Sequence, residues 1–170
     1  MQKLKIYLAG FDVFLPNAIT HGEKMKKICE LNGFIGLYPL DNEVLFDKTL
    51  QKEKIALIIK QENIKLIKKA DIVVSNLNPF RGFEMDSGTA YEIGFAEALE
   101  KQVFGYIDDT RSIVEKYQNH IKVTDDLFID ELSFTIENFD LPVNLMISAG
   151  TKIFQGGFEN CIKNLAKIYN

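Results

Sequence analysis

Two acidic side chains, Asp86 and Glu92, lie in the stretch of sequence that is richest in groups able to do chemistry. They stand just before and inside a helix predicted over 87–100, which follows a loop at 78–86. Asp86 is near the positive end of the helix dipole, which favours an ionised carboxylate. Glu92 has apolar neighbours on the helix, and a carboxylate among apolar side chains is costly unless it is paired or used in chemistry.

The helical wheel makes Glu92 a candidate functional group. At about 100° per residue it points roughly 130° away from the mean direction of the charged residues further along, although Ile93 falls on their side. These charged residues are Glu97, Glu100 and Lys101. The alternative for Glu92 is a surface glutamate, or one paired with Arg81. The alternative for Asp86 is a plain cap or turn residue, with Ser87 expected to be the N-cap of the helix.

The first predicted strand, 6–10, contains a phenol and ends in a glycine. Tyr7 is a candidate site residue or a core tyrosine, and Gly10 permits close approach of the backbone or simply forms a turn. No dinucleotide fingerprint, Walker lysine motif or hydrolase elbow is present. Cys29 and Cys161 form no C-x-x-C pair, and no metal-ligand spacing occurs. We therefore expect neither a disulfide framework nor a zinc site, and a reducing, cytoplasmic location.

Short apolar runs alternate with helical patterns along the chain. Continuous apolar runs are typical of parallel strands that are covered on both faces. We therefore predict an α/β fold, a single doubly wound domain over 1–170 with a mostly parallel five-stranded sheet of flavodoxin or Rossmann type. The predicted strands are 6–10, 34–38, 71–77, 103–107 and 151–154, and the predicted helices are 17–31, 61–69, 87–100, 142–147 and 158–169.

The site of such a sheet is expected beyond the carboxyl ends of its strands, in the loops after Leu8, Leu77 and Ile107. Two stretches have no clear secondary-structure pattern. The segment 41–60 suggests a helix interrupted by a loop, and 108–139 has no clear pattern.

Composition narrows the class of partner. The 170 residues carry a formal net charge of −4, with a sequence pI near 5.3. So acidic a chain lacks the positive field of a general nucleic-acid binder, and a small neutral nucleoside fits better than a polymer. No window approaches 18 apolar residues, so no membrane span is expected.

Four segments, taken in order and at their spacing, resemble the nucleoside 2-deoxyribosyltransferase family. They are Ile-Tyr-Leu-Ala-Gly at 6–10, Ala-Asp-Ile-Val-Val-Ser-Asn-Leu at 70–77 with Pro-Phe-Arg-Gly at 79–82, Asp-Ser-Gly-Thr-Ala-Tyr-Glu-Ile-Gly at 86–94, and Pro-Val-Asn-Leu-Met-Ile at 142–147. The resemblance implies transfer of 2-deoxyribose from one nucleobase to another through a covalent sugar–enzyme intermediate. Deoxynucleosides and free nucleobases are then the partners, in nucleoside salvage.

The resemblance also implies roles for individual residues. Glu92 matches the nucleophile, and Tyr7 matches the tyrosine that orients it. Asp86 matches a substrate-binding carboxylate, which could share in proton transfer to the departing base. Gly10 belongs with the substrate-binding residues through its close backbone approach, and Asn63 falls where relatives carry aspartate or asparagine near the base.

Asn144 and Met146 match residues that reach into a neighbouring subunit's site in the family, which implies a homo-oligomer. The chain departs from the family at Phe11, where many relatives have proline. Asn63 is a second departure of consequence, because an amide is no acid for the leaving base.

Positive charge develops on the sugar carbon C1′ when the glycosidic bond breaks. A carboxylate suits this reaction because it stabilises that charge and then forms the ester, as in retaining glycosidases. No metal or redox cofactor is required by this chemistry. A deoxyribonucleoside or deoxyribonucleotide N-glycosidase, in which water accepts the sugar, is the first alternative. A non-catalytic nucleotide-binding module on the same scaffold is the second, because a fold alone does not prove activity. The sequence does not distinguish purine from pyrimidine specificity.

Overall fold

Five parallel strands form the main sheet of the computed structural model, which describes residues 3–41, 50–124 and 127–169. Their order is β2-β1-β3-β4-β7, the flavodoxin-like order, as expected for a doubly wound α/β fold. β1 and β3, which are almost wholly buried, lie at the centre because their continuous apolar runs suit a strand covered on both faces. The strands are β1 Lys5–Ala9, β2 Ile35–Leu37, β3 Ile72–Asn76, β4 Gln102–Ile107 and β7 Thr151–Gln155.

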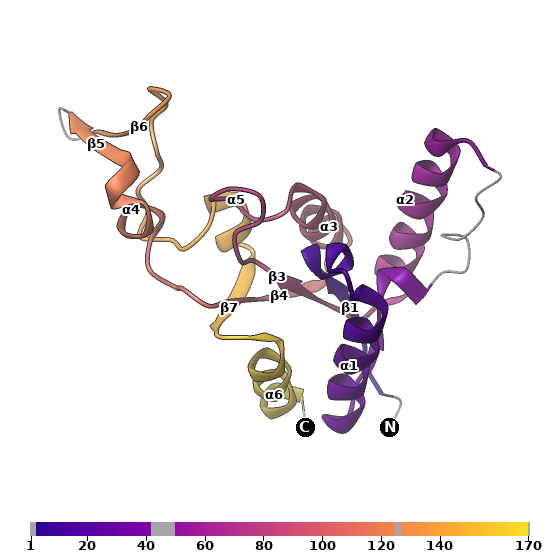
Figure 1. The fold of residues 1–170 in the computed structure, drawn as a ribbon. Coiled ribbons are helices and arrows are strands. Elements are labelled where there is room, and N and C mark those ends of the chain that lie inside the picture. Colours follow the sequence, from indigo (N-terminus) through magenta and orange to yellow (C-terminus); the bar gives the residue numbers. More distant parts are fainter. Residues whose placement is uncertain (1–2, 42–49, 125–126, 170) are drawn as a thin grey trace.

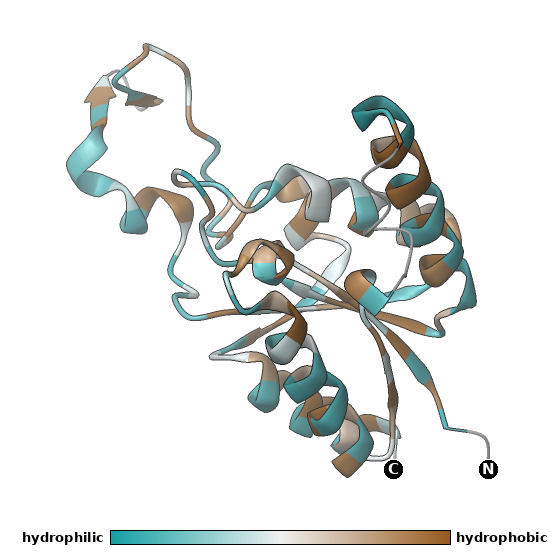
Figure 2. Ribbon diagram, turned by 45° about the vertical axis from the view of Figure 1, so that its right-hand side comes forward, coloured by the Kyte–Doolittle hydropathy of each residue, from teal (hydrophilic) through white to brown (hydrophobic). Residues whose placement is uncertain are grey.

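Helices cover both faces of this sheet, which confirms the doubly wound architecture (Figures 1 and 2). α1 (Ala18–Leu31) and α6 (Phe158–Tyr169) pack on one face around a core that includes Cys29 and Cys161. α2 (Lys52–Lys69), α3 (Ser87–Ala98) and α5 (Leu145–Ser148) contribute to a second core on the other face. The two cysteines are buried as free thiols.

Most predicted elements are confirmed to within one or two residues, and three differ more. The helical pattern at 61–69 is the second half of the longer helix α2, so its first half falls in the stretch that was hard to interpret; residues 42–49 of that stretch lie outside the described ranges. The helix expected from 142 begins only at Leu145, with Asn144 as its N-cap.

Gly33 follows the end of α1 with φ 88°, the left-handed conformation expected of a glycine at this position.

The third difference is the segment 108–139, for which no element was predicted. It forms α4 (Ile113–Lys116), a 3-10 turn at Gln118–His120 and an antiparallel hairpin of β5 (Ile121–Thr124) and β6 (Leu127–Asp130). The hairpin does not join the main sheet and projects from the body of the molecule (Figure 1).

Both chain ends lie on the side of the sheet opposite to the projecting hairpin (Figure 1). Two further 3-10 turns, Phe11–Phe14 and Pro39–Asp41, follow the carboxyl ends of β1 and β2. Within the described ranges, no helix combines the length and the apolar character that a membrane crossing requires.

Candidate active site

The carboxylate of Glu92 is held by two hydrogen-bond donors from other elements. The Tyr7 hydroxyl on β1 donates to Glu92 Oε1 at 2.5 Å. Asn63 Nδ2 on α2 donates to the same oxygen at 3.3 Å. Tyr7 is itself fully buried, so its phenol has a fixed position under the helix. Residues 85 positions apart in the sequence therefore meet at one oxygen atom.

Helix α3 places Glu92 at the edge of its buried face. Ile93 and Ala96 are fully buried in the core, so the expectation that Ile93 lies on the charged side was wrong. The helix ends at Ala98, and Glu100 adopts a positive φ of 58°, so two of the three residues that defined the charged side of the wheel, Glu100 and Lys101, lie beyond the helix. Glu92 is half-buried and faces α2, so its predicted position at a functional site agrees with the structure, although the helical wheel placed Ile93 on the wrong side.

Burial, and to a smaller extent the neighbouring charge of Asp86, raise the pKa of the Glu92 carboxyl to about 7. The hydrogen bonds from Tyr7 and Asn63 act in the opposite direction, because they stabilise the ionised form. The pKa of Tyr7 lies well above its ordinary value because the phenol is buried and faces the same carboxylate. Glu92 is therefore a titratable group near neutral pH, while Tyr7 stays a hydrogen-bond donor.

Asp86 is the N-cap of α3, a position expected for Ser87. Its Oδ2 accepts from the backbone N–H of Thr89 at 2.8 Å and from the Thr89 hydroxyl at 2.9 Å. Asp86 therefore does cap the helix, which was the alternative to a functional role for this residue. The same half-buried side chain also lines a cavity together with Glu92, so the two roles are compatible.

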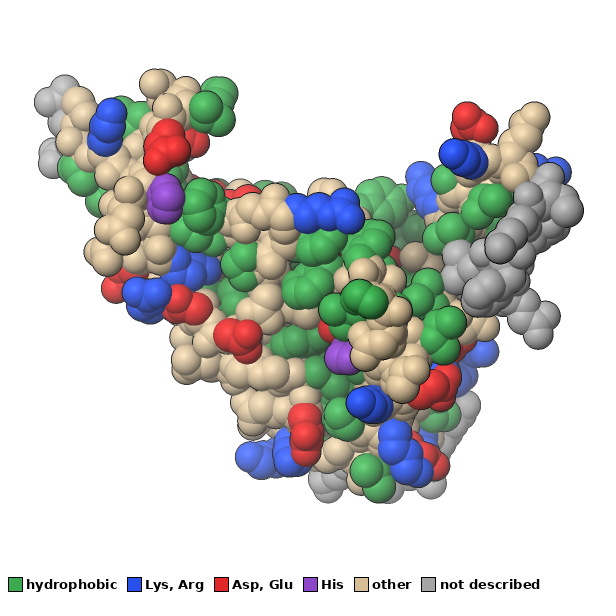
Figure 3. Space-filling view, viewed as in Figure 1, with side chains coloured by type: hydrophobic (Ala, Val, Ile, Leu, Met, Phe, Trp, Pro, Cys, Tyr) green, Lys and Arg blue, Asp and Glu red, His purple; other side chains and the backbone are tan. Residues whose placement is uncertain are grey.

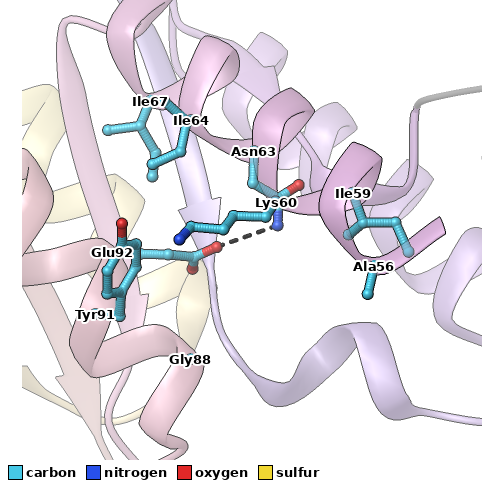
Figure 4. A pocket seen from close by; sticks show the side chains of 9 residues that line it. All are labelled: Ala56, Ile59, Lys60, Asn63, Ile64, Ile67, Gly88, Tyr91 and Glu92. Atoms are coloured by element: carbon cyan, nitrogen blue, oxygen red, sulfur yellow. Dashed lines mark hydrogen bonds between the residues drawn. The ribbon is translucent and has the colours of Figure 1, made fainter. Parts of the chain in front are cut away.

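Two cavities meet at Glu92. One, of about 260 Å³, lies over the carboxyl ends of β1 and β2 and is lined by Gly10, Val13, Phe14, Pro39, Leu40, Ile59, Asn63, Asp86, Gly88, Thr89 and Glu92. The other, of about 420 Å³, runs between α2 and α3 and is lined by Ala56, Ile59, Lys60, Asn63, Ile64, Ile67, Gly88, Tyr91 and Glu92 (Figure 4). Its wall is largely apolar, so the Glu92 carboxylate is an acidic group in a mostly hydrophobic groove.

Gly10 lies where the backbone must pass close to other groups. A Cβ at this position would come within 2.6 Å of Asp12 Oδ2 and 2.8 Å of Asn76 Cβ. Asp12 is buried and accepts hydrogen bonds from Asn76 at 2.9 Å, and His21 Nε2 lies 3.0 Å from its other oxygen. The lack of a side chain at Gly10 thus lets the first loop pack against the end of β3 and line the smaller cavity.

Arg81 does not pair with Glu92, the alternative that the sequence left open. Its guanidinium lies 4.6 Å from the ring centroid of Phe80 and 5.4 Å from that of Phe14. Phe11, a departure from the family pattern, stacks on Phe80 with ring centroids 5.2 Å apart. The first loop and the loop after β3 are therefore joined by aromatic contacts beside the smaller cavity.

The structure does not bring Asn144 and Met146 to the Glu92 of their own chain. Asn144 Oδ1 accepts from the Met146 N–H at 3.0 Å, and its Nδ2 donates to Glu137 at 3.2 Å. Met146 is 71% exposed. Neither residue lines the two cavities at Glu92, so a role for them in a neighbouring subunit's site stays a prediction.

Helix α2 supplies a wall of the site that the sequence analysis largely missed. Ala56, Ile59, Lys60 and Ile67 line the groove beside Asn63, at spacings of three and four residues that would have indicated one helix face. By contrast, the loop after Ile107 contributes to neither cavity at Glu92. In the described part of the chain, no three His, Cys, Asp or Glu side chains gather in a way that could hold a metal ion.

Comparison with known proteins agrees with this architecture. The chain is 32% identical to the 2-desoxiribosyltransferase from Leishmania mexicana, with a TM-score of 0.77 over 99% of this chain and 100% of that one. The 2-deoxyribosyltransferase from Bacillus psychrosaccharolyticus has the same fold, with 22% identity and a TM-score of 0.60 over 94% and 90% of the two chains.

A curated relative, an uncharacterised protein of Schizosaccharomyces pombe, is 35% identical over 118 residues. That match covers 69% of this chain but only 56% of the relative, so the chain spans about half the length of that protein. The profile of the nucleoside 2-deoxyribosyltransferase family matches residues 6–146. Because this match covers well over half of the chain, the protein belongs to the nucleoside 2-deoxyribosyltransferase family.

Proposed function

We propose that this protein, acting as a single domain over 1–170 in the cytoplasm, transfers 2-deoxyribose between nucleobases in nucleoside salvage. The observation that carries the proposal is the Glu92 carboxylate, half-buried where two cavities meet and bound by Tyr7 and Asn63. A carboxylate so placed can attack a sugar carbon, because its surroundings exclude much of the competing water while the two donors retain its charge.

The reaction proceeds by two displacements at the anomeric carbon, C1′. In the first, a Glu92 oxygen forms a bond to C1′ while the C1′–N bond breaks and its electron pair leaves with the base. In the second, a ring nitrogen of the incoming base forms a bond to C1′ as the bond from C1′ to the carboxylate oxygen breaks, and the proton on that nitrogen passes to Asp86. Each step inverts C1′, so the product retains the configuration of the substrate.

The neighbours of Glu92 have separate tasks. Tyr7 donates to Oε1 and fixes the direction of the carboxylate. Asp86 lines the smaller cavity, where it can bind the sugar and share a proton with the departing base. Asn63 Oδ1 is buried without a hydrogen-bond partner among the described residues, which suits it to accept a hydrogen bond from a base. As an amide it binds the base and does not protonate it.

A base-exchange assay tests the proposal directly. Deoxyinosine is incubated with the protein in the presence and absence of adenine, and products are separated by liquid chromatography. We expect deoxyadenosine and hypoxanthine when adenine is present. Free deoxyribose at the same rate with or without adenine would instead assign the N-glycosidase activity, which uses the same carboxylate. Tight nucleotide binding without any product would assign a binding module.

Asp86→Asn should lower base exchange by about 10²-fold, since general acid assistance and substrate orientation are lost. Asparagine caps helices as well as aspartate does, so the fold should be retained. Removing the charge also lowers the pKa of Glu92, because Asp86 raises it. The acid limb of the pH–rate profile should therefore shift to lower pH. An unchanged midpoint together with full activity would contradict the role of Asp86.

We also propose a homo-oligomer in which Asn144 and Met146 of the partner subunit complete the site. Met146 is exposed and lines neither cavity at the Glu92 of its own chain, which supports this arrangement.

Subunit mixing tests the shared site. Glu92→Gln and Asn144→Ser should each inactivate the pure protein; serine keeps the cap on α5 but is too short to reach a neighbour. In mixed dimers, purified with two different tags, one site keeps both residues, so about half of the wild-type activity should return. If no activity returns in mixed dimers, the two residues do not act across subunits.

A further inference from the structure

The turn at Phe11–Phe14, in the first loop, forms part of the wall of the smaller cavity but is anchored by little apolar burial. Val13 and Phe14 line that cavity, and Phe14 is 56% exposed. Figure 3 shows hydrophobic side chains gathered at the surface in the hollow between the projecting hairpin and α2. Among the four described residues of this turn, Asp12 alone is buried. The anchor of the turn is therefore a carboxylate and not an apolar side chain.

Within the described ranges, three polar side chains from three other elements converge on the Asp12 carboxylate. Asn76 Nδ2, at the end of β3, donates to Oδ2 at 2.9 Å, and the Tyr106 hydroxyl on β4 donates to the same oxygen at 3.4 Å. His21 Nε2 on α1 lies 3.0 Å from Oδ1, where it can donate as the Nε2–H tautomer. A buried carboxylate is costly unless it is bound in this way. Hydrogen bonds to a charged acceptor are also stronger than those between neutral groups.

The same network reaches the loop that leads to Asp86. Asn76 Oδ1 accepts from the backbone N–H of Asn78 at 3.1 Å and from its side-chain amide at 2.9 Å. Asn78 Oδ1 in turn accepts from the N–H of Asp108, just after β4, at 3.0 Å. The network therefore joins the loops that follow β1, β3 and β4 at the carboxyl edge of the sheet, beside the aromatic contacts between the first two of these loops.

We infer that Asp12 is a positioning residue for substrate binding, because the network centred on it holds the first loop where that loop shapes the smaller cavity. Asp12 lines neither cavity at Glu92, so it acts through Val13 and Phe14 and not on the substrate. When the network is broken, the loop adopts other positions and only a fraction of the molecules can bind. The apparent affinity falls by that fraction, whereas a bound substrate selects the competent position and reacts at the normal rate.

Asp12→Ala tests this role through the division of its effect between KM and kcat, and the test rests on the proposed function. The KM for deoxyinosine in base exchange should rise at least about tenfold because hydrogen bonds to a charged group are lost, while kcat stays within about threefold of wild type. In Asp12→Asn the amide can still accept from Asn76 and donate to the unprotonated Nε2 of His21, so the KM should return to within about threefold of wild type.

Asp71→Ala is the matched control. The Asp71 carboxylate also joins β1 and β3, since it accepts from the Lys5 N–H at 2.7 Å, but it does so at the amino ends of these strands. Its loss should leave the KM within about twofold of wild type, whatever it does to stability. A KM for Asp12→Ala that also stays within about twofold, or a fall in kcat alone, would overturn the inference.

Two milder variants keep the inference testable if Asp12→Ala does not fold. His21→Ala removes a half-buried side chain, and Tyr106→Phe removes a hydroxyl while the ring stays in the core. Each should raise the KM about threefold and the double variant about tenfold, with kcat retained, because each removes one of the bonds to Asp12. A double variant with the KM of the wild type would refute the positioning role.

Binding measured without turnover separates this inference from the proposed function. Deoxyinosine is titrated by calorimetry into Glu92→Gln, and into the same variant carrying Asp12→Ala or the His21 and Tyr106 changes. We expect the dissociation constant to rise by the factor found for the KM. Weakened binding in a protein that shows no base exchange with Glu92 intact refutes only the proposed function. Base exchange with a KM that these changes do not alter refutes only the role of Asp12, and no binding of deoxyinosine at all refutes both.

Discussion

Replacing Glu92 with glutamine should reduce base exchange by about 10⁴-fold or more while the protein remains folded. Glutamine has nearly the same shape and can still accept the hydrogen bond from Tyr7, so the packing around the site is preserved. It has no anionic oxygen to form the ester with C1′ or to stabilise positive charge on the sugar. The measurement is the initial rate of deoxyadenosine formation from deoxyinosine and adenine, with circular dichroism to check the fold.

Glu97→Gln is the matched control for this experiment. Glu97 lies on the same helix and is half-buried, but it lines neither cavity at Glu92. Its substitution should leave the rate within about twofold of wild type, as for surface changes away from a site. If Glu92→Gln retained most of its activity, another group would have to be the nucleophile and the proposed mechanism would be wrong. Mass spectrometry of the wild-type protein with deoxyinosine should also show a deoxyribosyl adduct that the variant lacks.

The second large effect concerns pH. Glu92 must be ionised to attack, and its pKa is about 7, so kcat/KM should fall tenfold per pH unit below that value and level off above it. Tyr7→Phe removes a hydrogen bond that stabilises the charged form. A hydrogen bond to a charged group contributes about 1.5–3 kcal/mol, so the midpoint should move up by about 1 to 2 pH units. The activity of Tyr7→Phe relative to the wild type should therefore be lower at pH 6 than at higher pH, and raising the pH should restore part of its activity.

Tyr38→Phe separates this electrostatic effect from the loss of a buried phenol oxygen. Tyr38 is as buried as Tyr7, and its hydroxyl has no hydrogen-bond partner among the described residues. It packs in the core on the other face of the sheet, away from Glu92. Its variant should keep the wild-type midpoint. A midpoint for Tyr7→Phe that also stays at the wild-type value would show that the phenol does not act through the carboxylate.

Much of the fold was predictable because its signals are local. β3 and β4 are continuous apolar runs, and the glycine after α1 has the backbone conformation that ends a helix. The elements of the segment 113–139 were not predicted, and the first half of α2 was only suggested, as a helix interrupted by a loop. α2 carries many charged side chains around a narrow apolar stripe that faces a groove, and the hairpin exposes its apolar residues, so neither has the pattern of an element packed into a core.

For the site, the sequence by itself determined which chemistry was available: a carboxylate near a helix start, a second one before it, and a tyrosine on the first strand. It left the direction of Glu92 undetermined, because a wheel drawn through residues beyond the end of α3 assigned Ile93 to the wrong side.

Only the tertiary structure decided that Tyr7 and Asn63 share one oxygen of Glu92. β1 lies beside β3 in the sheet, and α2 and α3 cover the same face, so side chains distant in sequence converge there. The same burial raises the Glu92 pKa to about 7. Desolvation depends on every neighbouring element at once, and for that reason no local stretch of sequence could have supplied it.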